Sequence, residues 1–474
     1  MNRAACLGTF AFLTVCISSG FALAQNHNRL QTDIRALATI PSVADIPANH
    51  GVVINANASR SAYIKRAADD NLVIVVDGAE GKEYQRVADG SPFFSPDGNH
   101  LASVAERNDH WYAVLDGTEG KSYDRIWDDS ATFSPNSRRF AYVAENDRKM
   151  RVVDDGAQGR AYDEISDGSL KFSADSVHLA YAAKRDGKYQ VVLDDSEGPI
   201  FDAVGWPVFS LDGRKIAYVG TRGAEQFVVV NGERGKPYDA LRPMSLTFSD
   251  DGAHLGFVAG KSGAMRTIID GVAGPKCEWI FDGSLVFSAD GKHSAYAARR
   301  AGDVVAMVDG RSGPPYDGVS SLTFSRDGRR VAYVAQRGEG WCVVVDGIPG
   351  RDYDWLAAGP RFSPDGRHVV YVADRNKPGH DRSEFIVVDD IEGKPFTWVR
   401  GLPVFSADST HLAYIAAGAD PRFDTGDEIP NNPDAIAAGG KVVFDKSMDY
   451  RELKPAEKNK PIELKAVEER IVAD

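Results

Sequence analysis

The sequence predicts an all-β fold, a β-propeller made of four-stranded blades in ten repeat units. The first observation behind this prediction is the motif Phe-Ser-x-Asp-Gly, which recurs with close variants at spacings of 37 to 43 residues. The second is that each unit divides into short apolar or alternating segments separated by turn residues. The third is that the residues between the copies do not show the 3.6-residue spacing of apolar residues that is typical of a helix. The motif copies begin at Phe94, Phe133, Phe172, Phe209, Phe248, Phe287, Phe324, Phe362 and Phe405.

A degenerate tenth copy precedes these nine, with Ile54 in the place of the phenylalanine and Tyr63 nine residues later. The one long spacing follows from an insertion at Asn376–Ser383, which we expect to form a loop. Ten copies exceed the four to eight blades that are usual. Because the spacing is regular and no Pro/Gly/Ser-rich linker interrupts the array, a single ten-bladed ring is favoured, with two tandem propellers as the alternative.

The eighth unit shows the predicted strands most clearly. Its first strand alternates polar and apolar residues, and its third is rich in β-branched valine. After the first strand comes a turn, best seen in Ser363-Pro364-Asp365-Gly366 of the next unit, with proline and glycine where a type I turn favours them. Asp346-Gly347 predicts a hairpin connection, because this pair tolerates positive φ. The four predicted strands are Ser321–Phe324, Val331–Ala335, Cys342–Val345 and Tyr353–Leu356.

The ends of the chain differ from the repeat array. Arg3, the apolar run Leu7–Ile17 and the small residues of Ala22-Leu23-Ala24 predict a secretory signal peptide cleaved before Gln25. We therefore expect an exported protein, periplasmic or secreted, with no transmembrane segment after cleavage. The predicted domains are a signal peptide (1–24), an N-terminal segment (25–49), the propeller repeats (50–453) and a charged C-terminal tail (454–474).

Some shorter elements near the ends are also expected. Asn28–Ala38 could form one helix, and Ile462–Ile471 a helix or an edge strand. In the last unit, a polar loop at Ala419–Gly440 is expected to precede a third strand at Lys441–Phe444.

Composition limits the function classes. The chain has 68 acidic and 55 basic residues and a formal charge of −13, so it lacks the basic footprint of a general nucleic-acid binder. After signal cleavage only Cys277 and Cys342 remain, and they fall in different, non-adjacent units. We expect each to be a small apolar residue in a packed strand.

Phe-Ser-Pro-Asp-Gly-x-x-x-Ala-Tyr-Val-Ala, followed by Val-Val-Val-Asp-Gly, resembles the WD40-like (PD40) repeats of the TolB-type propeller family. The resemblance covers nearly the whole mature chain and implies the propeller fold. It implies little about function, because TolB-type proteins carry a sizeable α/β domain before the propeller. Here only about 25 residues separate the signal from the repeats.

Two residue types recur at fixed places. Tyrosines nine residues after the motif start and in the fourth strand are expected to pack blade on blade. A basic residue lies six residues after every motif start, and in eight of the ten units an acid, such as Asp97 or Asp251, lies three residues before it. We expect repeated acid–base bonds that brace the first turn, while a basic ring that holds an anion or senses pH is the alternative. Histidine fills the position at His100, His178, His254, His293, His368 and His411, and arginine or lysine at Arg60, Arg139, Lys215 and Arg330.

Other candidate sites were weighed against turn chemistry. The Asp-Gly hairpins, with Asp194-Asp195 and Asp389-Asp390 as the densest acids, could bind calcium, but turn formation alone explains them. No cofactor or metal is therefore expected. Trp111, Tyr189 and Trp341 share one position at the start of the third strand and could form a recognition patch.

No catalytic motif is present: neither a Gly-x-Ser-x-Gly elbow, a His-Glu-x-x-His zinc helix nor a phosphate loop. The sequence therefore favours a non-enzymatic scaffold that binds a protein partner or a ligand, since a propeller's chemistry resides in what its loops present. The alternative is a lyase or hydrolase with a site at the central channel. The places where the repeat is broken, Lys377–Arg382 and Asp420–Asn432, are polar and lack a catalytic pattern.

Overall fold

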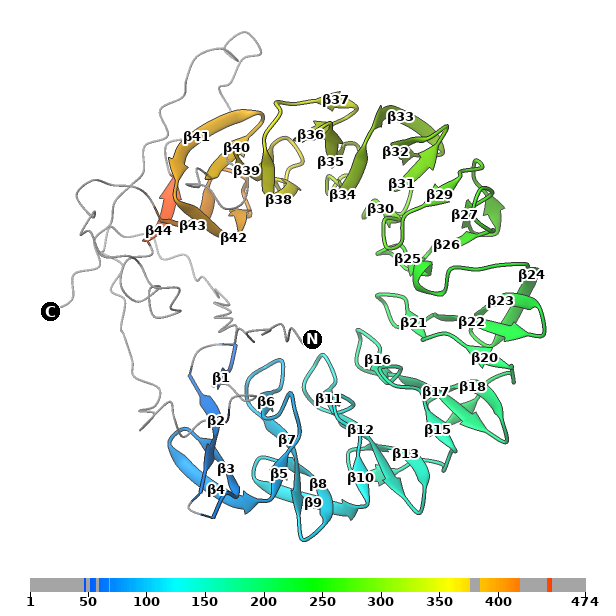
Figure 1. Ribbon diagram of the computed structural model, residues 1–474, viewed down its shortest axis with the longest axis vertical. Coiled ribbons are helices and arrows are strands. Elements are labelled where there is room, and N and C mark those ends of the chain that lie inside the picture. Colours follow the sequence, from blue (N-terminus) through cyan, green and yellow to red (C-terminus); the bar gives the residue numbers. More distant parts are fainter. Residues whose placement is uncertain are drawn as a thin grey trace, which may run out of the picture. The chain divides into compact units, whose positions relative to one another are not determined.

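A computed structural model describes Pro47 and residues 52–56, 59–67, 69–375, 384–417 and 441–445 (Figure 1). The predicted signal peptide, the Asn28–Ala38 helix, the insertion at 376–383, the polar loop at 419–440, the tail and Tyr450 lie outside these residues. The described part of the chain is all-β, with one short 3-10 turn, η2 (Pro243–Ser245). Within it, no helix is long and apolar enough to span a membrane. Two compact units divide it, one of residues up to Gly223 with Val228–Gly235, the other of Ala224–Phe227 and the residues from Lys236 onward.

The described strands form ten antiparallel sheets, which we number in chain order (Figure 1). Each sheet contains one copy of the repeated motif, and the prediction of an all-β fold of repeated antiparallel sheets is confirmed. The strands of sheets 1 to 5 are β1 (Val53–Ile54), β2 (Ser61–Arg66), β3 (Leu72–Val76), β4 (Ala79–Tyr84); β5 (Arg86–Val87), β6 (Phe93–Phe94), β7 (Leu101–Arg107), β8 (His110–Leu115), β9 (Thr118–Tyr123); β10 (Arg125–Ile126), β11 (Thr132–Phe133), β12 (Phe140–Asn146), β13 (Lys149–Asp154), β14 (Ala157–Gln158); β15 (Glu164–Ile165), β16 (Lys171–Phe172), β17 (Leu179–Arg185), β18 (Lys188–Leu193), β19 (Ser196–Glu197); and β20 (Ala203–Val204), β21 (Val208–Phe209), β22 (Ile216–Arg222), β23 (Glu225–Val230), β24 (Glu233–Tyr238).

Sheets 6 to 10 repeat the same order of strands, and in sheet 10 three strands are described. Their strands are β25 (Thr247–Phe248), β26 (Leu255–Ala259), β27 (Arg266–Ile269), β28 (Val272–Ala273); β29 (Trp279–Ile280), β30 (Val286–Phe287), β31 (Ser294–Arg300), β32 (Asp303–Val308), β33 (Arg311–Tyr316); β34 (Gly318–Phe324), β35 (Val331–Arg337), β36 (Gly340–Val345), β37 (Ile348–Pro349); β38 (Trp355–Phe362), β39 (Val369–Asp374), β40 (Glu384–Val388), β41 (Ile391–Phe396); and β42 (Trp398–Phe405), β43 (Leu412–Ala417), β44 (Lys441–Asp445). The strand predicted at Lys441–Phe444 is confirmed as β44.

Turn residues set the ends of these strands as the sequence predicts. Gly366 donates its N–H to the carbonyl of Ser363 at 2.8 Å, which closes the motif turn between β38 and β39. At the hairpin between β36 and β37, Asp346 and Gly347 have φ values of 52° and 80°. Both values are positive, as a tight hairpin of the primed type requires.

One strand prediction is wrong. Tyr353–Leu356 does not form the fourth strand of its unit. The fourth strand of sheet 8 is β37, directly after the hairpin, and the backbone of Tyr353 forms an isolated bridge to Trp341 outside that strand. Trp355 instead pairs with Asp374 and so begins the first strand of sheet 9. The chain therefore passes to the next sheet earlier than the apolar pattern suggests.

Within each of the two compact units, the hydrophobic core lies between neighbouring sheets. Between sheets 3 and 4, for example, Met150 and Val152 pack with Leu179 and Tyr181. Tyrosine pairs recur at these contacts: the rings of Tyr162 and Tyr181 meet edge to face with centroids 5.9 Å apart. The same edge-to-face contact joins Tyr123–Tyr142, Tyr316–Tyr333 and Tyr353–Tyr371. The prediction that the repeated tyrosines pack sheet against sheet is confirmed.

The free cysteines also fit the packing role predicted for them. Cys277 and Cys342 are both buried and unpaired. Each belongs to an apolar cluster between sheets, and burial raises the pKa of both thiols. A raised pKa keeps a thiol protonated and unreactive.

Candidate ligand-binding cleft

The first strand of several sheets is broken by a bulge. In sheet 2, β5 and β6 both pair with β7, and residues 88–92 bulge out between them. Ser91 fills the gap in the ladder, because its hydroxyl accepts the Val104 N–H at 3.1 Å. Ser130 and Ser169 do the same in sheets 3 and 4, accepting from Val143 and Ala182. The residues of a bulge form a short exposed loop at the edge of its sheet, such as Asp89-Gly90 in sheet 2.

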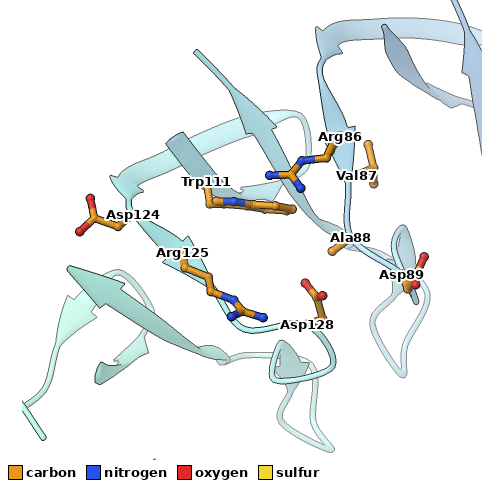
Figure 2. A pocket seen from close by; sticks show the side chains of 8 residues that line it. All are labelled: Arg86, Val87, Ala88, Asp89, Trp111, Asp124, Arg125 and Asp128. Carbon is orange, nitrogen blue, oxygen red and sulfur yellow. The ribbon is translucent and has the colours of Figure 1, made fainter. Parts of the chain in front are cut away.

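A cleft of about 490 Å³ lies beside the first two of these bulges, between sheets 2 and 3 (Figure 2). Its volume falls within the roughly 300–1,000 Å³ of typical small-ligand sites. Sheet 2 contributes its first strand, its bulge and the start of its third strand, and sheet 3 contributes the start of its first strand. The residues that line the cleft are Arg86, Val87, Ala88, Asp89, Trp111, Asp124, Arg125 and Asp128.

Strand register places Arg86 and Trp111 on the same row of sheet 2. Arg86 is opposite Glu106, and Glu106 is opposite Trp111 on the next strand. The guanidinium of Arg86 lies over the indole of Trp111, 5.2 Å from the ring centroid, and its Nε donates to the Glu106 carboxylate. This hydrogen bond raises the pKa of Arg86. The arginine is thus a fixed cation on one face of an aromatic ring.

Arg125 enters the cleft from the neighbouring sheet, and Figure 2 shows Trp111 between the side chains of Arg86 and Arg125. Arg125 stacks on Trp127 with its guanidinium carbon 4.0 Å from the ring centroid. Within the described part of the chain, it has no ion-pair partner. Asp124 caps the neighbouring turn by accepting the Asp147 N–H at 2.9 Å. The cleft therefore presents hydrogen-bond donors, carboxylate acceptors and an aromatic ring together.

The repeated basic residues pair with a different acid from the one predicted. His254 Nδ1 lies 2.6 Å from Asp270, the hairpin aspartate sixteen residues later, and not on Asp251 of the first turn. Asp251 accepts from Ser249 and the Ala253 N–H instead, and these bonds lower its pKa. The prediction failed because the pairing strands bring the hairpin back beside the motif turn. Equivalent pairs are Arg60–Asp77, His100–Asp116, His178–Asp194, His293–Asp309, Arg330–Asp346 and His368–Asp389. Arg139 pairs instead with Asp154, the last residue of β13, while the hairpin residue Asp155 accepts the Phe140 N–H.

The same basic residues also reach the following sheet. Arg330 lies over the ring of Phe362 and donates to the carbonyl of Arg367 at 2.7 Å. The ring of His254 stacks on Phe287 with centroids 6.5 Å apart. His411 differs, because its Nδ1 lies 2.7 Å from the Thr410 hydroxyl. These contacts indicate that the repeated basic residues brace the motif turn. Most of them are paired with a carboxylate of the hairpin, which neutralises their charge.

The densest hairpin acids are engaged in similar contacts. Asp194 pairs with His178, and Asp389 with His368. Asp390 accepts the Tyr371 hydroxyl at 3.1 Å. Across the described ranges, no group of three His, Cys, Asp or Glu side chains is placed to hold a metal ion.

The three aromatic residues expected to share a recognition patch have different neighbours. Trp111 lines the cleft, while Tyr189 lies under Lys184 at 5.1 Å. Trp341 meets Trp355 edge to face at 5.6 Å. The sequence thus identified Trp111 but missed Arg86 and Arg125. The missed signal was their separation of 39 residues, which equals the step from Phe94 to Phe133 and places one arginine in each of two successive units.

No family model and no curated protein matches this chain. Similar solved structures include TolB from Acinetobacter baumannii, with 17% identity over 61% of this chain and 79% of that chain and a TM-score of 0.25. The Cps50 (Swd1) β-propeller domain of Myceliophteria thermophila shows 12% identity over 52% and 92%, with a TM-score of 0.26. A eukaryotic initiation factor shows 12% identity over 71% and 94%, with a TM-score of 0.38. All these scores are below 0.5, so the argument for blades rests on the ten sheets themselves.

Proposed function

We propose that this protein is a non-enzymatic binding module and that the cleft between sheets 2 and 3 is its ligand site. The observation that carries the proposal is the row of Arg86, Glu106 and Trp111 facing Arg125. Trp111 is not part of the repeat framework, because Met150 and Val304 occupy its strand position in other sheets. Side chains that vary between units while the framework repeats are free to serve a ligand.

The non-enzymatic assignment rests on what the titratable groups contact. The hairpin aspartates brace turns, and the tyrosines with raised pKa values pack between sheets, as Tyr218 does with a pKa of about 12 caused by burial. The lining of the cleft offers carboxylates and guanidinium groups but no serine, cysteine, lysine or histidine. Guanidinium and carboxylate groups together can hold a ligand through hydrogen bonds.

A comparison of capture by cleft variants tests this function. Tagged mature protein, its Trp111→Ala/Arg125→Ala double variant and an Arg329→Gln control are incubated with envelope extract of the native cell. Eluates are compared by quantitative mass spectrometry. We expect the double variant to lose specific molecules by about thirtyfold, the effect of removing one interface hot spot. The control removes one charge from an exposed turn and should retain them. Equal capture by all three proteins would contradict the proposal.

Export to the periplasm or exterior and closure into a single ten-bladed ring of PD40 type belong to the same proposal. Export is supported by the charged start, the apolar run and Ala22-Leu23-Ala24. Closure is supported by the regular repeat spacing. The proposed domain limits are residue 24, from the signal peptide, and residues 49 and 453, from the extent of the repeats. N-terminal sequencing of protein from the periplasm or medium should begin at Gln25, and an intact Met1 there would argue against cleavage.

A further inference from the structure

A second pocket adjoins the cleft. It has a volume of about 210 Å³, lies between sheets 3 and 4, and is lined by Trp127, Asp129, Thr132, Ser166 and Asp167, among others. Arg125 lines the first pocket and Trp127 lines the second, and the two side chains stack on each other at 4.0 Å. The pockets therefore share this stacked pair as a wall and form one continuous row.

The row continues towards sheet 5. Trp206 is 50% exposed, which is unusual for so large an apolar ring. Its ring lies 3.5 Å from the place where Gly168 would carry a side chain, and Gly168 lines the second pocket. Lys171 lies 5.7 Å from the Trp206 ring. Three tryptophans, Trp111, Trp127 and Trp206, thus follow one another beside the two pockets. Such a row fits a chain of similar units better than a single small molecule.

The charges of the first pocket nearly cancel. Its lining has two guanidinium groups, Arg86 and Arg125, and three carboxylates, Asp89, Asp124 and Asp128. An anionic ligand would meet the carboxylates and a cationic ligand the arginines, so neither sign is favoured. A hydroxyl group is both donor and acceptor, and it can therefore bond to a guanidinium and a carboxylate at once. The lining is complementary to an uncharged ligand rich in hydroxyl groups.

The second pocket adds carboxylates and hydroxyl groups, and its lining has no basic side chain. It has the carboxylates of Asp129 and Asp167, the hydroxyl groups of Thr132 and Ser166, and one indole. The Nε1 atom of Trp127 is buried and has no acceptor within the described part of the chain.

An extended peptide is less well suited to this row. Peptides commonly bind by adding a strand to a free sheet edge. Here the first strands of sheets 2 to 4 are cut into two-residue pieces such as β5 and β6, with a bulge between the pieces. The bulges interrupt the backbone groups with which a peptide would pair.

We propose that the two pockets and Trp206 bind an uncharged oligosaccharide chain, with sugar faces on the indoles and hydroxyl groups on the arginines and aspartates. This proposal rests on the proposed function, because it names the ligand of the same cleft. The probes are maltohexaose, cellohexaose and chitohexaose, with hexagalacturonate and polyglutamate as charged comparisons, each titrated calorimetrically into the mature protein. We expect at least one neutral hexasaccharide to bind and both charged probes to bind more weakly.

Variants locate the binding. Trp111→Ala should lower the affinity for the neutral hexasaccharide by about three- to tenfold, the effect of one aromatic contact. Trp111→Phe should retain most of this affinity. Asp167→Ala tests the second pocket at an exposed position and should also weaken binding. Trp341→Ala is the matched control, because Trp341 occupies the strand position of Trp111 in sheet 8.

Each remaining outcome overturns the inference. If none of the three neutral probes binds, if a charged probe binds better, or if Trp341→Ala weakens binding as much as Trp111→Ala, the ligand is not an uncharged glycan on this row. The capture comparison then separates the two proposals. If the capture of proteins still depends on Trp111 and Arg125, the cleft is a binding site for a protein and only the glycan proposal is refuted. If the cleft variants change neither protein capture nor hexasaccharide binding, the binding function and the glycan proposal are both refuted.

Discussion

In sheets 2 to 10, the motif turn is held by one serine hydroxyl with two roles, and Asn55 takes this place in sheet 1. In sheet 7, Ser288 donates to Asp290 at 2.7 Å and accepts the His293 N–H at 3.0 Å. Ser288 is fully buried, so these bonds replace the water that its hydroxyl and the His293 N–H would otherwise contact. The bond from Ser288 is the largest cause that lowers the pKa of Asp290, followed by Lys292. The serine of the motif is therefore as important to the turn as the glycine.

The acid stability of the turn follows from this pKa. A carboxyl whose pKa is lowered in the folded state stabilises the fold above its usual range, and this contribution is lost as pH falls below that range. We predict that Ser288→Ala raises the pKa of Asp290 and moves acid unfolding to higher pH. At neutral pH it should cost about 1–3 kcal/mol, because the His293 N–H loses its acceptor. Acid and urea titrations followed by circular dichroism measure both effects. Ser312→Ala, at an exposed site, is the control and should leave both unchanged.

At the scale of the element, the hairpin aspartate joins the end of the third strand to the start of the second. Asp270 accepts the Leu255 N–H through one oxygen at 3.0 Å and pairs with His254 through the other at 2.6 Å. Sheet 5 has Asn231 at this position, and its amide oxygen accepts the Ile216 N–H at 2.9 Å. The backbone bond is thus retained without the charge, which indicates that it is the more important of the two.

This comparison predicts different costs for two substitutions. Asp270→Asn should keep the backbone bond and lose only an exposed ion pair, with a cost of about 0–1 kcal/mol. Asp270→Ala loses both and should cost about 1–3 kcal/mol. Urea unfolding of both variants beside the wild type measures the difference. Equal costs would mean that the ion pair, and not the backbone bond, holds the hairpin.

At the scale of the whole molecule, features that recur in every unit were predictable, and pairings of particular residues far apart in sequence were not. Phe-Ser-x-Asp-Gly and the Asp-Gly hairpins predicted the sheets from residues close in sequence, and the recurring tyrosines predicted packing between sheets because they repeat. The partner of His254 was predicted wrongly, since strand pairing brings Asp270 to it from sixteen residues away. The cleft was missed because it forms only when Arg125 of one sheet comes beside Trp111 of another. The bulge that exposes Asp89 depends on Ser91 in the first strand, and the repeat motif does not include it.

The number of rings is the last prediction at this scale. If ten blades close into one ring, each blade packs on two neighbours, and no break in the repeat is needed along the chain. The sequence has no such break, because the steps between Phe172 and Phe324 stay at 37 to 39 residues. We therefore predict that class averages of the full chain in negative-stain electron microscopy show one ring with ten radial blades. Two discs of fewer blades in the averages would instead establish tandem propellers. In that case the regular spacing would reflect duplication of the repeat and not closure, because unit length depends on the blade and not on how many blades share a ring.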